Sequence, residues 1–298
     1  MTRPRALLET MRPAQWVKNV FVAAPAVFAR SHSLGHPEVF ARALLATAVF
    51  ILLSGAVYVM NDVLDVEKDR RHPVKRHRPI ASGRLPVDQA VAGGLICLAA
   101  SWAAGYALGP GFLLTSLAYL VLNVAYSMSL KHVAYLDVLS IALGFLLRVL
   151  AGSFAIGLAF HEVSVFLLLC TFLVALYLAL GKRRHELVSL GNGVDESSRP
   201  ALRQYRLHHL DLALSVLAGV TLAVYGLYTV APQTREYFGH ARLAWTIPFV
   251  AFGLLRFLVL LKRSGESRSP TDVMIRDPWF LVNGIGYGVT AALVIYLA

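Results

Sequence analysis

Apolar residues occur along this chain in long stretches, separated by shorter polar segments. A helix needs about 20 mostly apolar residues to cross the hydrocarbon core of a bilayer. Nine stretches come close to that length, and the first is the weakest because Pro25 interrupts it. The pattern predicts an all-α polytopic membrane protein with spans at residues 17–34, 38–60, 88–108, 112–129, 135–158, 163–181, 210–231, 243–262 and 279–298.

The composition agrees with lipid as the solvent of this chain. The 298 residues are 57% hydrophobic with a mean hydropathy of +0.62, and 15% are charged, against roughly 25% in an ordinary soluble domain. We therefore expect one integral membrane domain over residues 1–298, with membrane lipids as its surroundings. A net charge of +11 would suggest nucleic acid in a soluble protein. Here we expect no nucleic-acid partner, because the positive charges lie mainly in the loops between the predicted spans.

The loops between the predicted spans alternate in character. One set is long and rich in Lys and Arg, whereas the other set carries only Arg30, Arg42, Arg235 and Arg242. Loops rich in Lys and Arg stay on the cytoplasmic side of a membrane. We therefore expect a multi-pass protein of the cell (plasma or inner) membrane with its N-terminus inside and, after nine spans, its C-terminus outside. The basic set comprises the N-terminus and residues 61–87, 130–134, 182–209 and 263–278.

The strongest chemical feature follows the second span, where an amide and several acids are crowded together. On a continuing helix, Asp62, Asp65 and Asp69 share one face, and Asn61 lies next to it. Carboxylates gathered at a membrane edge repel one another unless a cation neutralises them, and hard oxygen ligands suit Mg²⁺. The pattern favours a magnesium site. The alternative is a solvated helix end whose charge is balanced by Lys68, Arg70 and Arg71.

A basic cluster follows these acids at Lys75, Arg76, His77 and Arg78. Cations beside a metal site are what a bridged polyanion such as a diphosphate requires. A basic loop can also bind anionic lipid head groups, but lipid binding alone does not explain the carboxylates.

Two weaker polar groups lie next to other basic loops. Each could be a set of topology anchors, but both fall on the same predicted side as the acids, which favours one shared site. The first group contains Asn123, Tyr126, Ser127, Lys131 and Asp137, and the second contains Gly181, Lys182, Arg183, Arg184, His185 and Glu186.

Arg148 lies inside the fifth predicted span, eleven residues after Asp137. That spacing is close to three helical turns, so the two residues share a stripe. A cation at this depth normally faces a partner or a polar cavity. We expect Arg148 to line the cavity, with a structural pair as the alternative. Arg256 is nearer a loop, and we expect it to extend toward water.

The pattern N-D-x-x-D-x-x-x-D at 61–69, followed by Lys75-Arg76-His77-Arg78-Pro79-Ile80, resembles the UbiA superfamily of intramembrane prenyltransferases. The resemblance covers nearly the whole chain. It implies a nine-helix bundle that opens laterally to a polyprenyl chain and has a polar cap on the cytoplasmic side.

One departure points to a particular branch of that superfamily. Enzymes that use prenyl diphosphates generally carry a second aspartate-rich motif, whereas residues 126–137 contain a single aspartate. With Arg12-Pro13-Ala14-Gln15-Trp16-Val17-Lys18-Asn19 and Gly181-Lys182-Arg183, the chain resembles the decaprenyl-phosphate phosphoribosyltransferases. The resemblance implies a donor, phosphoribosyl pyrophosphate, whose additional phosphate suits the many cations here. It also implies a polyprenyl phosphate acceptor and a product that leads to arabinosyl lipid donors for cell-wall or other glycans.

We therefore expect an Mg²⁺-dependent transferase that releases pyrophosphate and forms polyprenyl-phosphoryl-5-phosphoribose. One alternative is a UbiA-type prenyltransferase acting on an aromatic or other small acceptor, and a second is a non-catalytic lipid transporter. The sequence leaves a homo-oligomer open. Asn61, Asp62, Asp65 and Asp69 are the expected metal ligands, with the three acids catalytic. The expected substrate-binding residues are Lys18, Asn61, Lys75, Arg78, Tyr126, Ser127, Lys131, Asp137, Arg148, Lys182 and Arg183.

Overall fold

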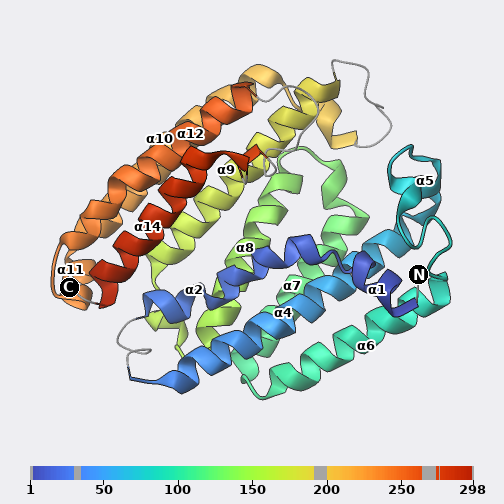
Figure 1. Ribbon diagram of the computed structural model, residues 1–298, viewed down its shortest axis with the longest axis horizontal. Coiled ribbons are helices and arrows are strands. Elements are labelled where there is room, and N and C mark those ends of the chain that lie inside the picture. Colours follow the sequence, from blue (N-terminus) through green and yellow to red (C-terminus); the bar gives the residue numbers. More distant parts are fainter. Residues whose placement is uncertain (1–2, 30–34, 191–199, 264–272, 275, 297–298) are drawn as a thin grey trace. The chain divides into compact units, whose positions relative to one another are not determined.

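A computed structural model describes residues 3–29, 35–190, 200–263, 273–274 and 276–296. Every regular element among these residues is a helix, as predicted (Figure 1). Eight helical segments are long and apolar enough to cross a membrane; one of them joins the 3₁₀ helix η7, Arg242–Thr246, to α12. The principal helices are α4 (Pro37–Leu64), α6 (Val87–Tyr106), α7 (Pro110–Met128), α8 (Leu136–Ala155), α9 (Val165–Leu190), α10 (Leu207–Val230), α12 (Ile247–Arg263) and α14 (Pro278–Tyr296).

Proline marks where several of these helices begin. Pro37, Pro110 and Pro278 are the first residues of α4, α7 and α14. The first turn of a helix has no carbonyl partner for its N–H groups, so proline loses nothing there, and its fixed φ suits the helix. Each apolar stretch is thus given a defined start. The 28 residues of α4 reach about 42 Å, at about 1.5 Å per residue, which is longer than the hydrocarbon core.

The described residues form two compact units. The described residues within 1–128 and 144–163 form unit 1, and those within 129–143 and 164–298 form unit 2. Helix α8 begins in unit 2 and ends in unit 1.

In unit 1, helix α4 is the central element. It packs along α6 and contacts α7 and the short helix α2, Val20–Phe28 (Figure 1). Phe50, Leu53 and Phe112 are fully buried in this core. Gly152 allows α2 to approach α8 closely, because a Cβ at this position would lie 1.9 Å from the carbonyl oxygen of Val22. The N-terminal segment is therefore packed inside the unit.

The first predicted span is not confirmed as a membrane-crossing helix. The chain forms α1 (Arg3–Thr10), a 3₁₀ helix η1 (Pro13–Asn19) and the nine-residue α2. Residues 30–34 of the predicted span lie outside the described residues. The segment nevertheless runs beside α4 in the opposite direction, because Arg12 pairs with Asp62 and Asn19 with Ser54. Pro25 within α2 removes a backbone donor and disfavours a long uninterrupted helix.

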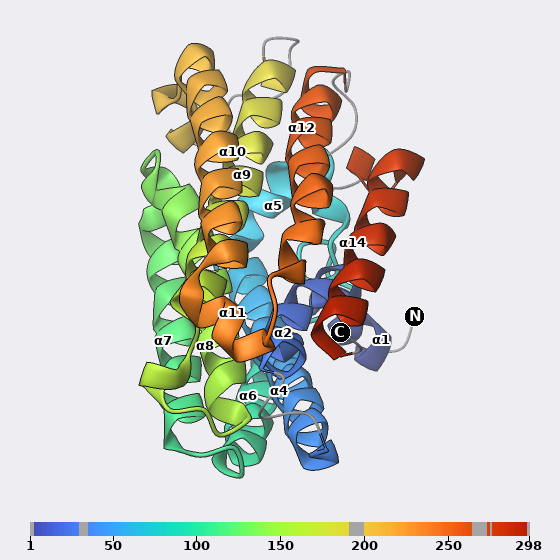
Figure 2. The same cartoon turned by 90° about the vertical axis from the view of Figure 1, so that its left-hand side faces the viewer.

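In unit 2, α10 packs against both α9 and α12, and α12 against α14 (Figure 2). The core contains Tyr177, Leu210 and Phe257, all nearly inaccessible to solvent. Tyr177 donates a hydrogen bond of 2.8 Å to the carbonyl of Leu254, so its hydroxyl is satisfied in an apolar interior. The short elements of this unit include η3 (Leu130–His132), η6 (Pro200–Gln204) and α11 (Pro232–Phe238).

Candidate functional site

The acidic motif of unit 1 lies where α4 ends. The expectation of one continuing helix is wrong in detail, because α4 stops at Leu64 and the short helix α5, Val66–Arg71, begins after Asp65. Asp65 leaves helical geometry with φ −95° and ψ 7°. Backbone hydrogen bonds from Asp65 to Asn61 and from Asp69 to Asp65 keep the two helices closely joined.

Asp62 and Asp69 face the same partner despite this break. One nitrogen of Arg78, Nη1, lies 3.1 Å from Asp62 Oδ1 and 2.6 Å from Asp69 Oδ2. Nη2 of Arg12 approaches Asp62 Oδ1 to 2.5 Å. We call Arg12, Asp62, Asp69 and Arg78 the Asp62 cluster. Two carboxylates and two guanidinium groups balance each other's charge within it.

The two kinds of side chain in this cluster differ in exposure. The carboxylate side chains are 4% exposed, whereas those of Arg12 and Arg78 are 33% and 30% exposed. The acids are therefore held by the fold, and the cations cover them from the accessible side. Asp62, Asp69 and Arg78 thus meet in one polar group. Asp65, expected on the same helical face, stands at the helix break instead.

Arg12 is the residue that sequence reasoning missed at this position. In the sequence it stands out only as the first residue of the Arg12–Asn19 motif. Its backbone φ of 55° is in the left-handed region, which is uncommon for a residue other than glycine. Its guanidinium lies 4.9 Å from the centre of the Tyr58 ring, a cation–π distance. The Pro13 that follows gives no hint of it, since a residue before proline is expected to be extended.

The donor set fits Mg²⁺ in part. No group of three or more His, Cys, Asp or Glu side chains within the described part of the chain is arranged to hold a metal. Asp62 and Asp69, however, already flank a single cationic nitrogen, and Mg²⁺ often takes only one or two carboxylates and completes its shell with water and phosphate. Asp65 is half-buried and lies outside this pair. The amide oxygen of Asn61 accepts a hydrogen bond from Ser127.

Arg148 is buried in unit 1 among neutral groups. Its Nε donates to Asn19 (3.0 Å), its Nη1 to the carbonyl of Gly144 (3.0 Å) and its Nη2 to the hydroxyl of Tyr119 (2.8 Å). The guanidinium also lies over the rings of Tyr119 and Phe145. Among the described residues no carboxylate pairs with it. All three guanidinium nitrogens of Arg148 thus have neutral hydrogen-bond acceptors, and whether it lines a cavity stays a prediction.

Asp137 and Arg183, both predicted to bind substrate, are paired with each other in unit 2. Arg183 Nε lies 2.8 Å from Asp137 Oδ2 in an ion pair, and both side chains are at most 3% exposed. Arg183 also pairs with Glu186. Tyr205 donates a hydrogen bond of 2.6 Å to Asp137 Oδ1, and burial raises the pKa of Tyr205 far above its usual range. Their side chains are committed to this closed network, which favours a structural role over direct phosphate binding.

The remaining predicted residues divide between the two units. Lys18, Lys75 and Tyr126 are half-buried in unit 1, and Ser127 is buried there. Lys131 is half-buried and Lys182 exposed in unit 2. A single site that joins all of them stays a prediction.

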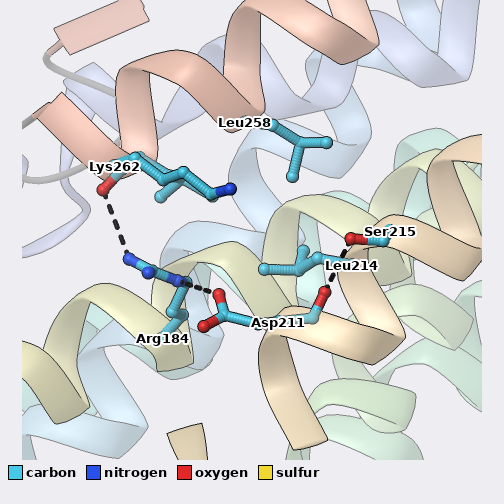
Figure 3. A pocket seen from close by; sticks show the side chains of 7 residues that line it. Arg184, Asp211, Leu214, Ser215, Leu258 and Lys262 are labelled. Carbon is cyan, nitrogen blue, oxygen red and sulfur yellow. Dashed lines mark hydrogen bonds and ion pairs between the residues drawn. The ribbon is translucent and has the colours of Figure 1, made fainter. Parts of the chain in front are cut away.

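A small pocket in unit 2 lies at the ends of α9, α10 and α12 (Figure 3). Arg184 Nε pairs with Asp211 at 2.5 Å, and its Nη1 approaches the carbonyl of Leu261 at 3.4 Å. Arg184 therefore ties three helix ends together. Arg256 is likewise paired, with both oxygens of Asp277 at 3.1 and 2.6 Å; the expectation that it simply extends toward water missed this partner.

The chain was compared with known proteins. Residues 19–275 match the UbiA prenyltransferase family. The decaprenyl-phosphate phosphoribosyltransferase of Mycobacterium tuberculosis is 33% identical over 273 residues, covering 91% of this chain and 88% of the relative. That of Corynebacterium glutamicum is 28% identical, covering 98% and 87%.

Among solved structures, a UbiA homolog from Archaeoglobus fulgidus bound to DMAPP and Mg²⁺ superposes with a TM-score of 0.71 at 19% identity, covering 98% of this chain and 99% of that one. The likeness concerns the fold. Together with the eight apolar helices, these findings make the chain a multi-pass membrane protein that belongs to the UbiA prenyltransferase family.

Proposed function

We propose that this protein transfers 5-phosphoribosyl from phosphoribosyl pyrophosphate to a polyprenyl phosphate of the decaprenyl type and releases pyrophosphate. The observation that carries the proposal is the similarity to decaprenyl-phosphate phosphoribosyltransferases over nearly the full length of both chains. The Asp62 cluster supplies chemistry that fits such a donor: buried carboxylates for a cation, and accessible arginines for phosphate.

In this proposal Asp62 and Asp69 hold Mg²⁺, with Asp65 and Asn61 as further ligands, directly or through water. The ion would act as a Lewis acid toward the leaving pyrophosphate. With the two carboxylates turned to Mg²⁺, Arg12 and Arg78 would be released from them and would be able to bind phosphate oxygens. Guanidinium groups suit that role because they form paired, charge-assisted hydrogen bonds.

The lysines would neutralise the rest of the donor's charge. Lys75, Lys131 and Lys182 are assigned to donor phosphates, and Tyr126 and Ser127 to hydrogen bonds with the donor. Lys18 and Arg148 are candidates for either phosphate. The acceptor phosphate is already anionic near neutral pH, so the chain needs no strong general base. Catalysis then rests on positioning and on stabilisation of the charge that develops as the sugar C1–O bond breaks.

Placement in the cell follows from the charge pattern. The basic loops predict that the Asp62 cluster faces the cytoplasm, where a soluble phosphorylated donor would reach it. We further propose that the lipid product is a precursor of arabinosyl lipid donors used in cell-wall or other glycan arabinosylation.

The test offers two donors to the purified protein in lipid. With phosphoribosyl pyrophosphate, a polyprenyl phosphate and Mg²⁺, mass spectrometry should detect a phosphoribosylated lipid, and pyrophosphate should appear in equal amount. Chelation of Mg²⁺ should stop both. The parallel reaction contains dimethylallyl diphosphate and a small aromatic acceptor. Consumption of that donor alone would contradict the proposal and favour a prenyltransferase.

A further inference from the structure

The segment that precedes α10 forms hydrogen bonds to the loop between α7 and α8 and holds it in place. Within unit 2, Gln204 accepts a hydrogen bond from the backbone N–H of Ala134 (3.1 Å) and donates one to the carbonyl of His132 (3.2 Å). A single side-chain amide thus satisfies two backbone groups of a loop about 70 residues earlier in the chain. Backbone groups bonded in this way are fixed in both position and direction.

Tyr205 holds the same loop from the next position. Its hydroxyl accepts the N–H of Tyr135 (2.8 Å) and donates to Asp137 Oδ1 (2.6 Å). Its ring meets that of Tyr135 edge-on, with centroids 4.9 Å apart. The Tyr205 side chain is buried and keeps its proton, because burial raises its pKa. Both hydrogen bonds are therefore available throughout the ordinary pH range.

The loop between α7 and α8 contains a strained residue. Tyr135 has a φ of 66°, in the left-handed region that bulky side chains rarely adopt. Such a conformation persists only when its surroundings over-determine it. Burial of the tyrosine does not explain it, since Tyr135 is 48% exposed. The hydrogen bonds of Gln204 to the backbone just before it, and of Tyr205 to the N–H of Tyr135 itself, do.

The loop carries a functional candidate near its start and adjoins a fixed residue at its end. Lys131 stands near the start, and Asp137, in the first turn of α8 just after the loop, pairs with the buried Arg183. The backbone between them cannot move without breaking bonds to Gln204 and Tyr205. Strain of this kind gathers at sites where a side chain must be held in one place.

We propose that Gln204 and Tyr205 are positioning residues that hold the loop so that Lys131 meets the phosphates of the donor. This inference rests on the proposed function for the identity of the donor. It adds two residues to the donor site that the motif-based analysis did not include. Neither residue touches the substrate; both act through the backbone of residues 132–135.

The first test removes one hydroxyl. Tyr205→Phe keeps the ring and loses both hydrogen bonds of the oxygen. The KM for phosphoribosyl pyrophosphate should rise about tenfold, as expected for loss of buried hydrogen bonds, while the KM for the lipid stays unchanged. Tyr106→Phe, at an exposed position of α6, is the matched control and should change neither. An equal rise in both KM values would indicate general damage and overturn the proposal.

The second test asks whether Tyr205 acts through Lys131. If it does, adding Tyr205→Phe to Lys131→Ala should leave the donor KM of Lys131→Ala nearly unchanged, because coupled residues are not additive. If the two effects multiply, the positioning role is wrong.

The third test uses the strained residue itself. Tyr135→Asn and Tyr135→Val both remove the ring contact, but asparagine tolerates the left-handed region and a β-branched residue does not. The donor KM should be clearly higher for Tyr135→Val than for Tyr135→Asn. Equal values would show that the backbone conformation does not matter to the donor.

Backbone hydrogen exchange separates this proposal from the proposed function. Gln204→Ala should speed exchange at Ala134, and Tyr205→Phe should speed it at Tyr135, whatever the substrate is. Unchanged exchange would show that the hydrogen bonds from Gln204 and Tyr205 do not hold the loop. Should the wild type use a prenyl diphosphate instead, the proposed function fails. The KM tests then apply to that donor, and an unchanged KM in Tyr205→Phe would refute the positioning role as well.

Discussion

Two groups of paired charges in this protein differ in how far their side chains are exposed. In the Asp62 cluster the acids are buried and the arginines are about one-third exposed. In the Asp137–Arg183 pair both partners are buried, and Tyr205 and Glu186 complete the network. In the proposed function the first group exchanges its arginines for a cation that arrives from solution. The second can be opened only by disrupting the fold, so one group suits chemistry and the other structure.

This comparison predicts its largest effect at the acids of the Asp62 cluster. Asp62→Asn or Asp69→Asn keeps the shape and removes the charge that would hold a cation. We expect turnover to fall about 10²–10³-fold, the scale of losing one preorganised electrostatic group. Pyrophosphate release in membranes, measured over a range of Mg²⁺ concentrations, is the readout.

The control for these variants is Asp88→Asn, an exposed acid in the first turn of α6. It should turn over at the wild-type rate. Asp65→Asn should fall between the two, because Asp65 stands at the helix break and outside the pair bridged by Arg78. Normal turnover in Asp62→Asn would remove the distinction between the two charge groups.

Substitutions in the buried Asp137–Arg183 pair of unit 2 should change the stability of the protein. Removing one member of a buried ion pair leaves the other charge uncompensated and costs about 3–5 kcal/mol. Arg183→Met or Asp137→Leu should therefore lower thermal stability in detergent strongly. The double variant should recover much of the loss, since an apolar replacement of both partners is often close to neutral.

These variants also separate the two roles proposed for Arg183. If the double variant is stable and binds the donor with wild-type affinity, the pair is structural. Stability restored without donor affinity, if Tyr205→Phe leaves the donor KM unchanged, would instead return Arg183 to the phosphate site that the sequence suggested.

Arg148 allows a finer test, because it is buried like Arg183 but has only neutral partners. Asn19→Asp supplies a carboxylate of the same shape beside its Nε, now 3.0 Å from the Asn19 oxygen. If the charge of Arg148 serves a substrate phosphate, this variant should raise thermal stability and weaken substrate binding several-fold. Binding isotherms for donor and lipid, each with the wild type alongside, would show which phosphate is affected. A stability gain with unchanged binding would make Arg148 purely structural.

The sequence predicted the class of fold and most of its helices, because span length and apolar content are local properties. The first span failed as a helix because its ending and its path depend on packing: Asn19 bonds Ser54, and Gly152 admits the backbone of Val22. Such contacts join residues far apart in the chain. Hydropathy along the chain carries no information about these contacts.

The candidate site was predicted in its residue types and less well in its pairings. Helical spacing placed Asp62, Asp65 and Asp69 on one face. Asp62 and Asp69 do meet Arg78, whereas Asp65 stands at the helix break outside this pair. Spacing did not reveal Arg12, which reaches Asp62 from 50 positions away through a left-handed backbone. It also could not distinguish Arg183 from Lys182, because a one-residue step around a helix separates a buried cation from an exposed one.

The smallest expected effect belongs to a third ion pair, Asp277–Arg256, which sets the scale for a pair at the edge of the fold. Asp277 also caps α14 by accepting the N–H of Phe280 at 2.7 Å. Asp277→Asn keeps a good cap and loses the ion pair, so it should cost about 0–1 kcal/mol. Asp277→Ala loses both and should cost about 1 kcal/mol more.

Hydrogen bonding to Arg256 lowers the pKa of Asp277 below its ordinary value of 3.8. The stabilisation is therefore complete above that value and is lost as the pH falls through the lowered pKa. Wild type and Asp277→Asn, unfolded by heat at a series of pH values, should differ at pH 6 and converge in strong acid. A difference that persists in strong acid would show that the ion pair is not its source.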